Sequence, residues 1–144
     1  MKTPVLLAVD GPAERFAPLF AAAKAAGLRV GWLVMNAKAD PPPPLQAPPL
    51  LEAFRAVAVG EGRSIAMKPM KGKAVLRDLL REHFLGADVV LVSGLELFPR
   101  LTPRGEGPWH LAESATAGRA YTTEELLVRL RKPALRWKKD ERAT

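Results

Sequence analysis

Two short runs of consecutive apolar residues constrain the fold of this 144-residue chain more than any other feature. Residues 5–9 are all apolar, and residues 88–94 contain four apolar residues in a row between polar or glycine ends. Runs of this length without alternation are typical of strands that are buried on both faces, as in the centre of a parallel sheet. We therefore expect a layered fold in which helices cover both sides of a sheet.

Helical patterns alternate with these strands. Between the first strand and a second strand-like run over residues 28–35, apolar residues recur with the spacing of one helix face. Because proline is tolerated only in the first helical turn, Pro18 places the start of this helix near Ala17 and leaves residues 11–16 as a loop. Residues 72–85 show the clearest helical periodicity in the chain and predict a second helix.

The remaining segments complete the expected architecture. Residues 57–59 and 64–67 flank a glycine-rich turn and predict a hairpin. The proline- and glycine-rich stretch over residues 95–118 predicts a long irregular loop, and residues 119–121 a last strand. Residues 122–125 fit a capping box at the start of a third helix. This alternation predicts an α/β fold, a three-layer Rossmann-like or P-loop-like arrangement with a mainly parallel sheet.

Composition and charge suggest how the chain is organised. Residues 40–49 contain four consecutive prolines and a further pair, which favours an exposed polyproline connector within a single domain over residues 1–130. Residues 131–144 form a basic tail. The net charge is +7, but residues 129–144 alone contribute +5 and the other 128 residues only +2. The body of the protein is therefore nearly neutral.

Several classes of protein are excluded or disfavoured. The chain has no cysteine and only two histidines, which excludes disulfides, thiolate nucleophiles and cysteine-ligated metals and predicts no metal site. No apolar run reaches the length of about 18–20 residues that spans a membrane, and the first residues do not resemble a signal peptide, so we expect a cytoplasmic protein without a membrane partner. One asparagine and one glutamine suggest a thermophilic source.

The loop after the first strand has the layout of a phosphate-binding loop without its functional residues. In the pattern G-x-x-x-x-G-K-[S/T], backbone N–H groups cradle phosphates, the lysine meets the outer phosphates and the hydroxyl holds Mg²⁺. Counted from Gly11, Phe16 replaces the second glycine, Ala17 the lysine and Pro18 the hydroxyl. Because the main electrostatic stabilisation of phosphoryl transfer is missing, we expect no nucleotide hydrolysis and assign no catalytic residue.

Three segments carry a resemblance to a known family: PVLLAVDGP at residues 4–12, AAGLRVG at residues 25–31 and ADVVLVSG at residues 87–94. In this order, and over roughly residues 4–130, the chain resembles the molybdopterin-guanine dinucleotide biosynthesis protein B family. The resemblance implies a P-loop α/β protein, commonly dimeric, that binds GTP and assists nucleotide attachment to the molybdenum cofactor. It implies GTP or a molybdopterin-type ligand, a homodimer, and a partner protein in cofactor biosynthesis.

The match of individual residues to this family is partial. Gly11 corresponds to the opening glycine of the phosphate loop and Asp88 to the acidic start of a core strand, whereas Ser93 replaces the glutamate that precedes the glycine at Gly94. We therefore predict a degenerate paralogue, a non-catalytic accessory or binding protein that resembles the adaptor of molybdenum-cofactor guanylylation. The candidate nucleotide- or phosphate-binding residues are Asp10, Gly11, Arg15, Lys73, Asp88, Ser93 and Gly94.

Two other functions remain open. A nucleic-acid-binding module, which we favour less, would use the basic tail with its tryptophan and the lysine-rich turn at residues 68–73. A GTP-binding enzyme would need an unconventional phosphate site at Arg15 or Lys73. Arg15 could replace the missing lysine, but a surface ion pair with Asp10 or Glu14 is the more common role for such a residue.

Trp109 and His110, in the expected long loop, have two interpretations. They could form a lid or a platform on which a base stacks, or Trp109 could be a packing anchor. We favour the packing anchor.

Overall fold

The computed structural model describes residues 4–35, 55–68, 70, 72–104 and 108–131. The chain divides into two compact units, the first formed by Met1–Asn36 together with Leu76–Thr144 and the second by Ala37–Val75. The predicted connector lies outside the described residues, as does the predicted tail apart from Arg131. The single domain over residues 1–130 stays a prediction. No helix within the described residues is long and apolar enough to cross a membrane.

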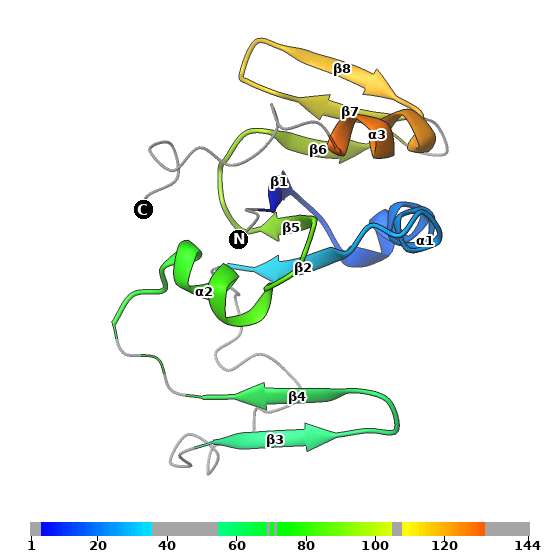
Figure 1. The fold of residues 1–144 in the computed structure, drawn as a ribbon. Helices are drawn as coiled ribbons and strands as arrows, with labels where there is room; N and C mark the ends of the chain where they lie inside the picture. Colours follow the sequence, from blue (N-terminus) through cyan, green and yellow to red (C-terminus); the bar gives the residue numbers. More distant parts are fainter. Residues whose placement is uncertain (1–3, 36–54, 69, 71, 105–107, 132–144) are drawn as a thin grey trace. The chain divides into compact units, whose positions relative to one another are not determined.

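The first unit is built on a six-stranded sheet with the order β2-β5-β1-β6-β7-β8 (Figure 1). The strands are β1 (Val5–Val9), β2 (Val30–Val34), β5 (Val89–Ser93), β6 (Arg100–Pro103), β7 (Trp109–Ala112) and β8 (Gly118–Tyr121). The first four strands in this order run parallel, and β7 and β8 continue the sheet antiparallel. The predicted α/β class with a mainly parallel sheet is confirmed.

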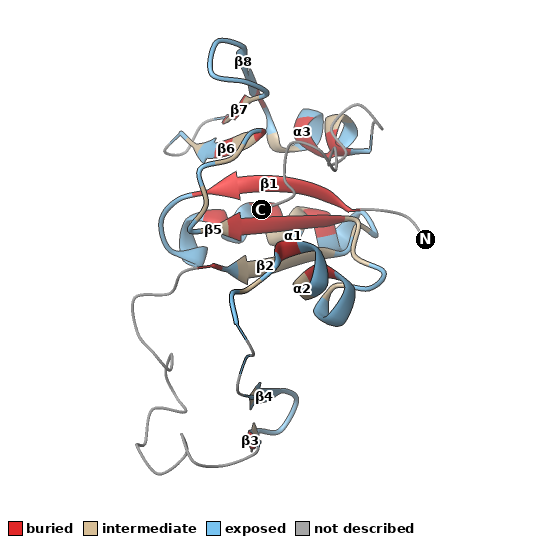
Figure 2. Cartoon of the chain, turned by 90° about the vertical axis from the view of Figure 1, so that its left-hand side faces the viewer, coloured by how far each residue is buried: buried red, intermediate tan, exposed pale blue. Residues whose placement is uncertain are grey.

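The two apolar runs form the inner strands β1 and β5. These strands pair in register from Val5 opposite Val89 to Val9 opposite Ser93. Every residue of β1 is buried, and β5 is buried as far as Val92 (Figure 2). Burial of one valine or leucine side chain contributes roughly 1.5–3 kcal/mol, so these two strands form the most strongly stabilised part of the sheet.

Helices cover both faces of this sheet. They are α1 (Ala17–Ala25), preceded by a 3₁₀ turn η1 (Ala13–Phe16), α2 (Leu76–His83) and α3 (Thr123–Leu130). Figure 1 shows α1 and α3 on one side and α2 on the other. Two neighbouring residues of β2 confirm this arrangement: Trp32 contacts Phe16 and Phe20 near α1, whereas a Cβ on Gly31 would lie 2.5 Å from the ring of Phe84, which follows α2. The predicted three layers are present.

The start of α3 confirms the predicted capping box. The hydroxyl of Thr122 accepts a hydrogen bond from the backbone N–H of Glu125 at 3.1 Å, and the Glu125 carboxylate accepts one from the N–H of Thr122 at 2.9 Å. The hydrogen bond from the Thr122 backbone holds the pKa of Glu125 below its ordinary value. Helix α3 then buries three leucines on the same core as α1: Leu126, Leu127 and Leu130.

Two predictions about secondary structure are wrong. Helix α2 begins at Leu76 instead of residue 72, because Gly72 adopts a φ of +74°, which a right-handed helix cannot contain. The stretch 95–118 is not irregular, since it contains β6 and β7. Strand β6 ends at Pro103, which still pairs with β7. In β7, every second residue is buried, namely Trp109 and Leu111.

The second unit contains the predicted hairpin. Strands β3 (Ala56–Val59) and β4 (Ser64–Met67) pair antiparallel, with Val59 opposite Ser64. These two strands form a separate sheet that has no third strand within the described residues. Val57, Val59 and Ile65 remain 59%, 78% and 49% exposed. The hairpin therefore presents apolar side chains that the described residues leave uncovered.

Candidate functional site

The carboxyl ends of β1 and β5 form the candidate site. In the sheet, the connection from β1 to β2 crosses β5, and the connection from β5 to β6 crosses β1. The two connections therefore leave their strands in opposite directions along the sheet. Ligands of open α/β sheets bind at such a switch point, outside the carboxyl ends of the strands. Because β1 and β5 are in register, Asp10 and Gly11 emerge beside Ser93 and Gly94. The structure thus brings together four of the seven predicted residues, and Arg15 joins them as described below.

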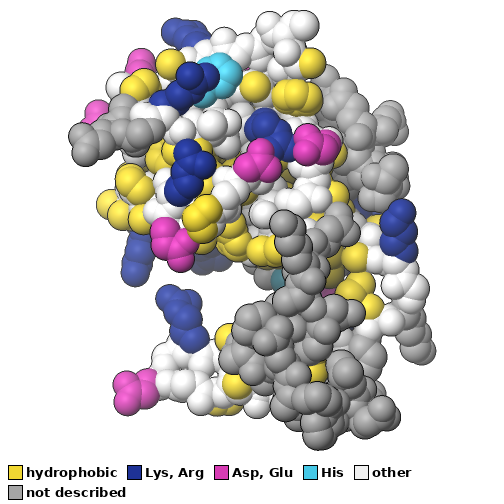
Figure 3. All heavy atoms as spheres, turned by 180° about the vertical axis from the view of Figure 1, so that it is seen from behind, with side chains coloured by type: hydrophobic (Ala, Val, Ile, Leu, Met, Phe, Trp, Pro, Cys, Tyr) yellow, Lys and Arg dark blue, Asp and Glu magenta, His cyan; other side chains and the backbone are white. Residues whose placement is uncertain are grey.

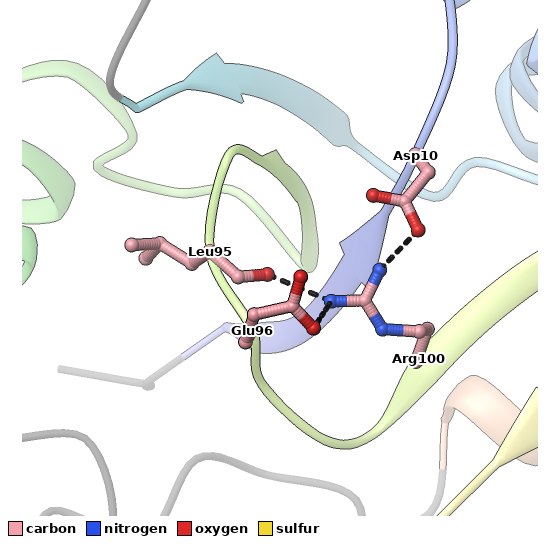
Figure 4. Close-up of polar contacts among 4 residues, drawn as sticks. All are labelled: Asp10, Leu95, Glu96 and Arg100. Atoms are coloured by element: carbon pink, nitrogen blue, oxygen red, sulfur yellow. Dashed lines mark hydrogen bonds and ion pairs between the residues drawn. The ribbon is translucent and has the colours of Figure 1, made fainter.

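Arg100 is the centre of the polar contacts at this edge. It is the first residue of β6, beside Ala8 of β1. Its Nη1 donates to Oδ2 of Asp10 at 2.5 Å, and its Nη2 donates to the carbonyl oxygen of Leu95 at 2.8 Å and to Oε2 of Glu96 at 3.5 Å (Figure 4). The Arg100 side chain is only 15% exposed, whereas those of Asp10 and Glu96 are 78% and 97% exposed. A fixed cation is therefore paired with two solvated carboxylates.

The sequence analysis missed Arg100. A basic residue directly after a proline, and six positions after the glycine that follows a strand, carries little signal by itself. Its significance depends on β6 lying next to β1, which places Arg100 over the end of β1. One signal was available: Arg100 lies eight residues after Val92, the last residue of the second apolar run, close enough for its side chain to return to the same edge.

Arg15 packs on the loop glycine. A Cβ on Gly11, whose φ is +88°, would lie 3.3 Å from Nη1 of Arg15. Nη2 of Arg15 donates to the carbonyl oxygen of Pro103 at 3.4 Å, which joins the loop to β6. The expected ion pair of Arg15 with Asp10 or Glu14 is wrong, since Arg15 forms no ion pair within the described part of the chain and Asp10 pairs with Arg100.

Phe16 occupies the position of the second loop glycine and is completely buried. Its ring lies between two tryptophans, with centroids 5.6 Å from Trp32 and 5.8 Å from Trp109. The loop forms the 3₁₀ turn η1, and Pro18 lies in the first turn of α1. The segment that is expected to surround a phosphate therefore packs an aromatic wedge into the core.

Trp109 is a packing anchor. It is 4% exposed, and its indole Nε1 donates to the hydroxyl of Thr123 at 2.9 Å. Because both its ring and its N–H are engaged inside the fold, the favoured interpretation of this residue is confirmed and it does not form a lid.

Gly94 permits a close approach of two strand ends. Its φ is +93°, and a Cβ at this position would collide with the carbonyl oxygen of Met35. The N–H of Met35 donates to the carbonyl of Ser93 at 2.8 Å, which holds the end of β2 against this corner. A larger residue at Gly94 would break the carboxyl edge on which Asp10 and Arg100 meet.

Two predicted residues lie elsewhere. Asp88 precedes β5 and accepts a hydrogen bond from the N–H of Arg29 at 2.9 Å at the amino edge of the sheet. A strand of five residues spans roughly 16 Å, so Asp88 does not reach the site. Lys73 belongs to the second unit, where it is exposed.

The surface of the described residues gives little support to a metal or nucleic-acid site. No group of three or more metal-ligating side chains occurs among the described residues. On the face shown in Figure 3, the basic side chains lie apart from one another, with acidic side chains between some of them. Most of the predicted basic tail, Lys71 and the tryptophan of the tail lie outside the described residues.

Together, the parallel core, the glycine-led loop after β1 and the helix that follows it define a P-loop-like α/β domain in which the loop after β1 buries Phe16. Solved structures with a similar fold are MobB proteins. The MobB from Bacillus subtilis is 17% identical, with a TM-score of 0.50 over 72% of this chain and 69% of that chain. A MobB homologue from Bacillus stearothermophilus is 22% identical, with a TM-score of 0.43 over 66% of this chain.

The comparison with the B. subtilis protein confirms the resemblance at the level of the fold. The chain spans 60% of the length of the B. stearothermophilus protein and 69% of that of the B. subtilis protein. No protein-family model matches the chain, and no curated protein sequence matches it.

Proposed function

We propose that this protein is a non-catalytic accessory or binding protein of molybdenum cofactor biosynthesis that does not cradle a nucleoside triphosphate. The observation that carries the proposal is the complete burial of Phe16 at the position of the second loop glycine. An intact phosphate loop needs glycine there so that its backbone N–H groups can approach the phosphates. The fold shared with MobB proteins supports the assignment to this pathway.

The charges around the loop point in the same direction. Ala17 and Pro18 supply neither the lysine nor the hydroxyl that binds Mg²⁺, and proline removes one N–H donor from the helix start. The solvated carboxylate of Asp10 adds a negative charge directly before Gly11, which disfavours a triphosphate. The role that remains for the domain is to hold a partner protein or a smaller anionic ligand.

The proposal is tested by calorimetry and thermal shift with GTP, ATP, GDP and a molybdopterin-type ligand, each with and without Mg²⁺. A ligand at 100 times its Kd stabilises the native state by about 2.7 kcal/mol, so even micromolar binding shifts the transition at millimolar concentration. We expect no shift with GTP or ATP. Micromolar Mg-GTP binding that is lost in Gly11→Val would overturn the proposal.

The same preparation tests the two alternatives. An enzyme with an unconventional phosphate site would turn over GTP and lose that activity in Arg15→Ala or Lys73→Ala. A nucleic-acid-binding module would bind polynucleotides with a steep dependence on salt, because each phosphate contact releases counterions. We expect neither turnover nor salt-dependent binding.

We also propose that the chain pairs with a second copy through the β3-β4 hairpin. A two-stranded hairpin is marginally stable in water, and this one exposes Val59 and Ile65 on opposite faces. A second hairpin that pairs antiparallel with β3 would give this strand a second neighbour and satisfy its exposed backbone edge. We expect a dimer by light scattering that Val59→Lys dissociates and that Val128→Lys, at an exposed valine of α3, leaves intact. A monomeric wild type would contradict the proposal.

A further inference from the structure

We propose that Arg100 is the receptor for a single phosphate group, carried by a phosphate monoester or by free phosphate, which binds by displacing the Asp10 carboxylate. The inference rests on the proposed function in one respect: the site holds one phosphate group and not the triphosphate of an intact phosphate loop. The inference is carried by the position of the Arg100 guanidinium, which is held at the switch point of the sheet next to solvated carboxylates.

Arg100 is positioned before any ligand arrives. The carbonyl of Pro99 accepts a hydrogen bond from the N–H of Ala8 at 2.9 Å, which fixes the start of β6 against β1. The carbonyl of Leu95 then fixes Nη2 of the guanidinium at 2.8 Å. A planar guanidinium held in this way presents a fork that matches two oxygens of a phosphate, with little side-chain entropy left to lose.

The present carboxylate partners of Arg100 are easily exchanged. Asp10 is 78% exposed and follows β1 on a loop, and Glu96 is 97% exposed with its Oε2 at 3.5 Å, the limit of a hydrogen bond. Ion pairs to solvated carboxylates contribute little net stability, because the carboxylate is well hydrated when it is free. A carboxylate that is paired with a cation in this way lies at the position where an anionic ligand would bind.

A second guanidinium lies next to the same loop. Arg15 packs against Gly11, the residue after Asp10, and hydrogen bonds to Pro103 of the strand that carries Arg100. Once the Asp10 carboxylate turns into solvent, two cations remain beside the loop. A phosphate monoester carries between one and two negative charges at neutral pH, which matches them better than a single carboxylate does.

The test is a titration at constant ionic strength with inorganic phosphate and with phenyl phosphate, followed by calorimetry and ³¹P NMR. Arg100→Gln should weaken binding of both probes by at least about tenfold, because the fork is lost. Asp10→Asn should tighten binding by up to about fivefold, because it removes the competing charge. Arg119→Gln, at an arginine of β8 that stacks on Tyr121, is the control and should bind as the wild type does.

The variant Arg100→Lys separates a loss of binding from a loss of folding, because it keeps the positive charge and removes the forked guanidinium. It should retain the wild-type thermal transition while binding phosphate more weakly. Tighter binding of phenyl phosphate than of inorganic phosphate identifies a monoester as the ligand, and the reverse identifies free phosphate.

Equal binding by Arg100→Gln and the wild type, or equal losses in Arg100→Gln and Arg119→Gln, would overturn the inference. Weaker binding by Asp10→Asn would also overturn it. These outcomes are independent of the proposed function, which fails only if Mg-GTP binds and the binding depends on Gly11.

Discussion

Replacement of Phe16 by alanine tests whether the loop after β1 is part of the core. The side chain is fully buried, and its ring contacts Trp32 and Trp109 at centroid distances of 5.6 and 5.8 Å. Removal of a buried phenylalanine side chain costs roughly 3–5 kcal/mol, and the loss of two aromatic contacts places this site toward the upper end. A domain of this size has an unfolding free energy of about 5–15 kcal/mol, so the variant loses a large part of it.

Urea unfolding followed by far-UV circular dichroism measures this loss. With an m-value of about 2 kcal/mol/M, a loss of about 4 kcal/mol lowers the midpoint by about 2 M. Phe20→Ala is the matched control, because Phe20 also contacts Trp32, at 6.1 Å, but is only half-buried. If Phe16→Ala costs no more than Phe20→Ala, the wedge does not stabilise the core and the reasoning is refuted.

Three further predictions concern the framework that holds the site. The pKa of Glu125 is below its ordinary value of 4.5. The ionised carboxylate therefore stabilises the native state above that pH, and this contribution disappears as the pH falls through the lower native pKa. The difference in unfolding free energy between wild type and Glu125→Gln, measured by urea unfolding, should be present at pH 7 and close toward pH 3. Gly31→Ala should destabilise by roughly 1–3 kcal/mol through its clash with Phe84, and Phe84→Leu should recover part of the loss in a double-mutant cycle, unless the ring simply moves aside. Gly94→Ala, at a φ of +93° and against a backbone carbonyl, should abolish phosphate binding and lower the thermal transition, whereas a transition equal to that of the wild type would show that the corner is not tightly packed.

Local sequence signals predicted the elements that are defined by their own residues. The apolar runs of β1 and β5 are long enough to indicate buried strands without knowledge of their neighbours. The capping box at Thr122 follows from side-chain and backbone chemistry within a few residues, and so does the start of α1 at Ala17, which Pro18 indicates. Such features need no long-range contact, which is why they were found.

Elements defined by distant partners were missed. Strands β6 and β7 have four residues each, too few for a clear period, and they are strands because β6 pairs with β1 and β7 pairs with β6. Arg100 acquires its role from the same pairing. The position of Asp88 could have been inferred, since a residue that precedes a parallel strand lies at the amino edge, opposite the site.

The burial of Phe16 bears both on ligand binding at the loop after β1 and on the stability of the fold. Phe16 cannot both fill the space between Trp32 and Trp109 and leave room for a phosphate at the backbone, because a completely buried ring excludes any ligand from its own position. The aromatic wedge therefore strengthens the core and leaves no room for a phosphate at its own position. Arg100 and Asp10 lie at the same edge of the sheet but outside this wedge, on the end of β6 and the turn after β1, where a ligand can still reach them. An anion that binds this protein should consequently respond to changes at Arg100 and be insensitive to conservative changes at Phe16, such as Phe16→Leu.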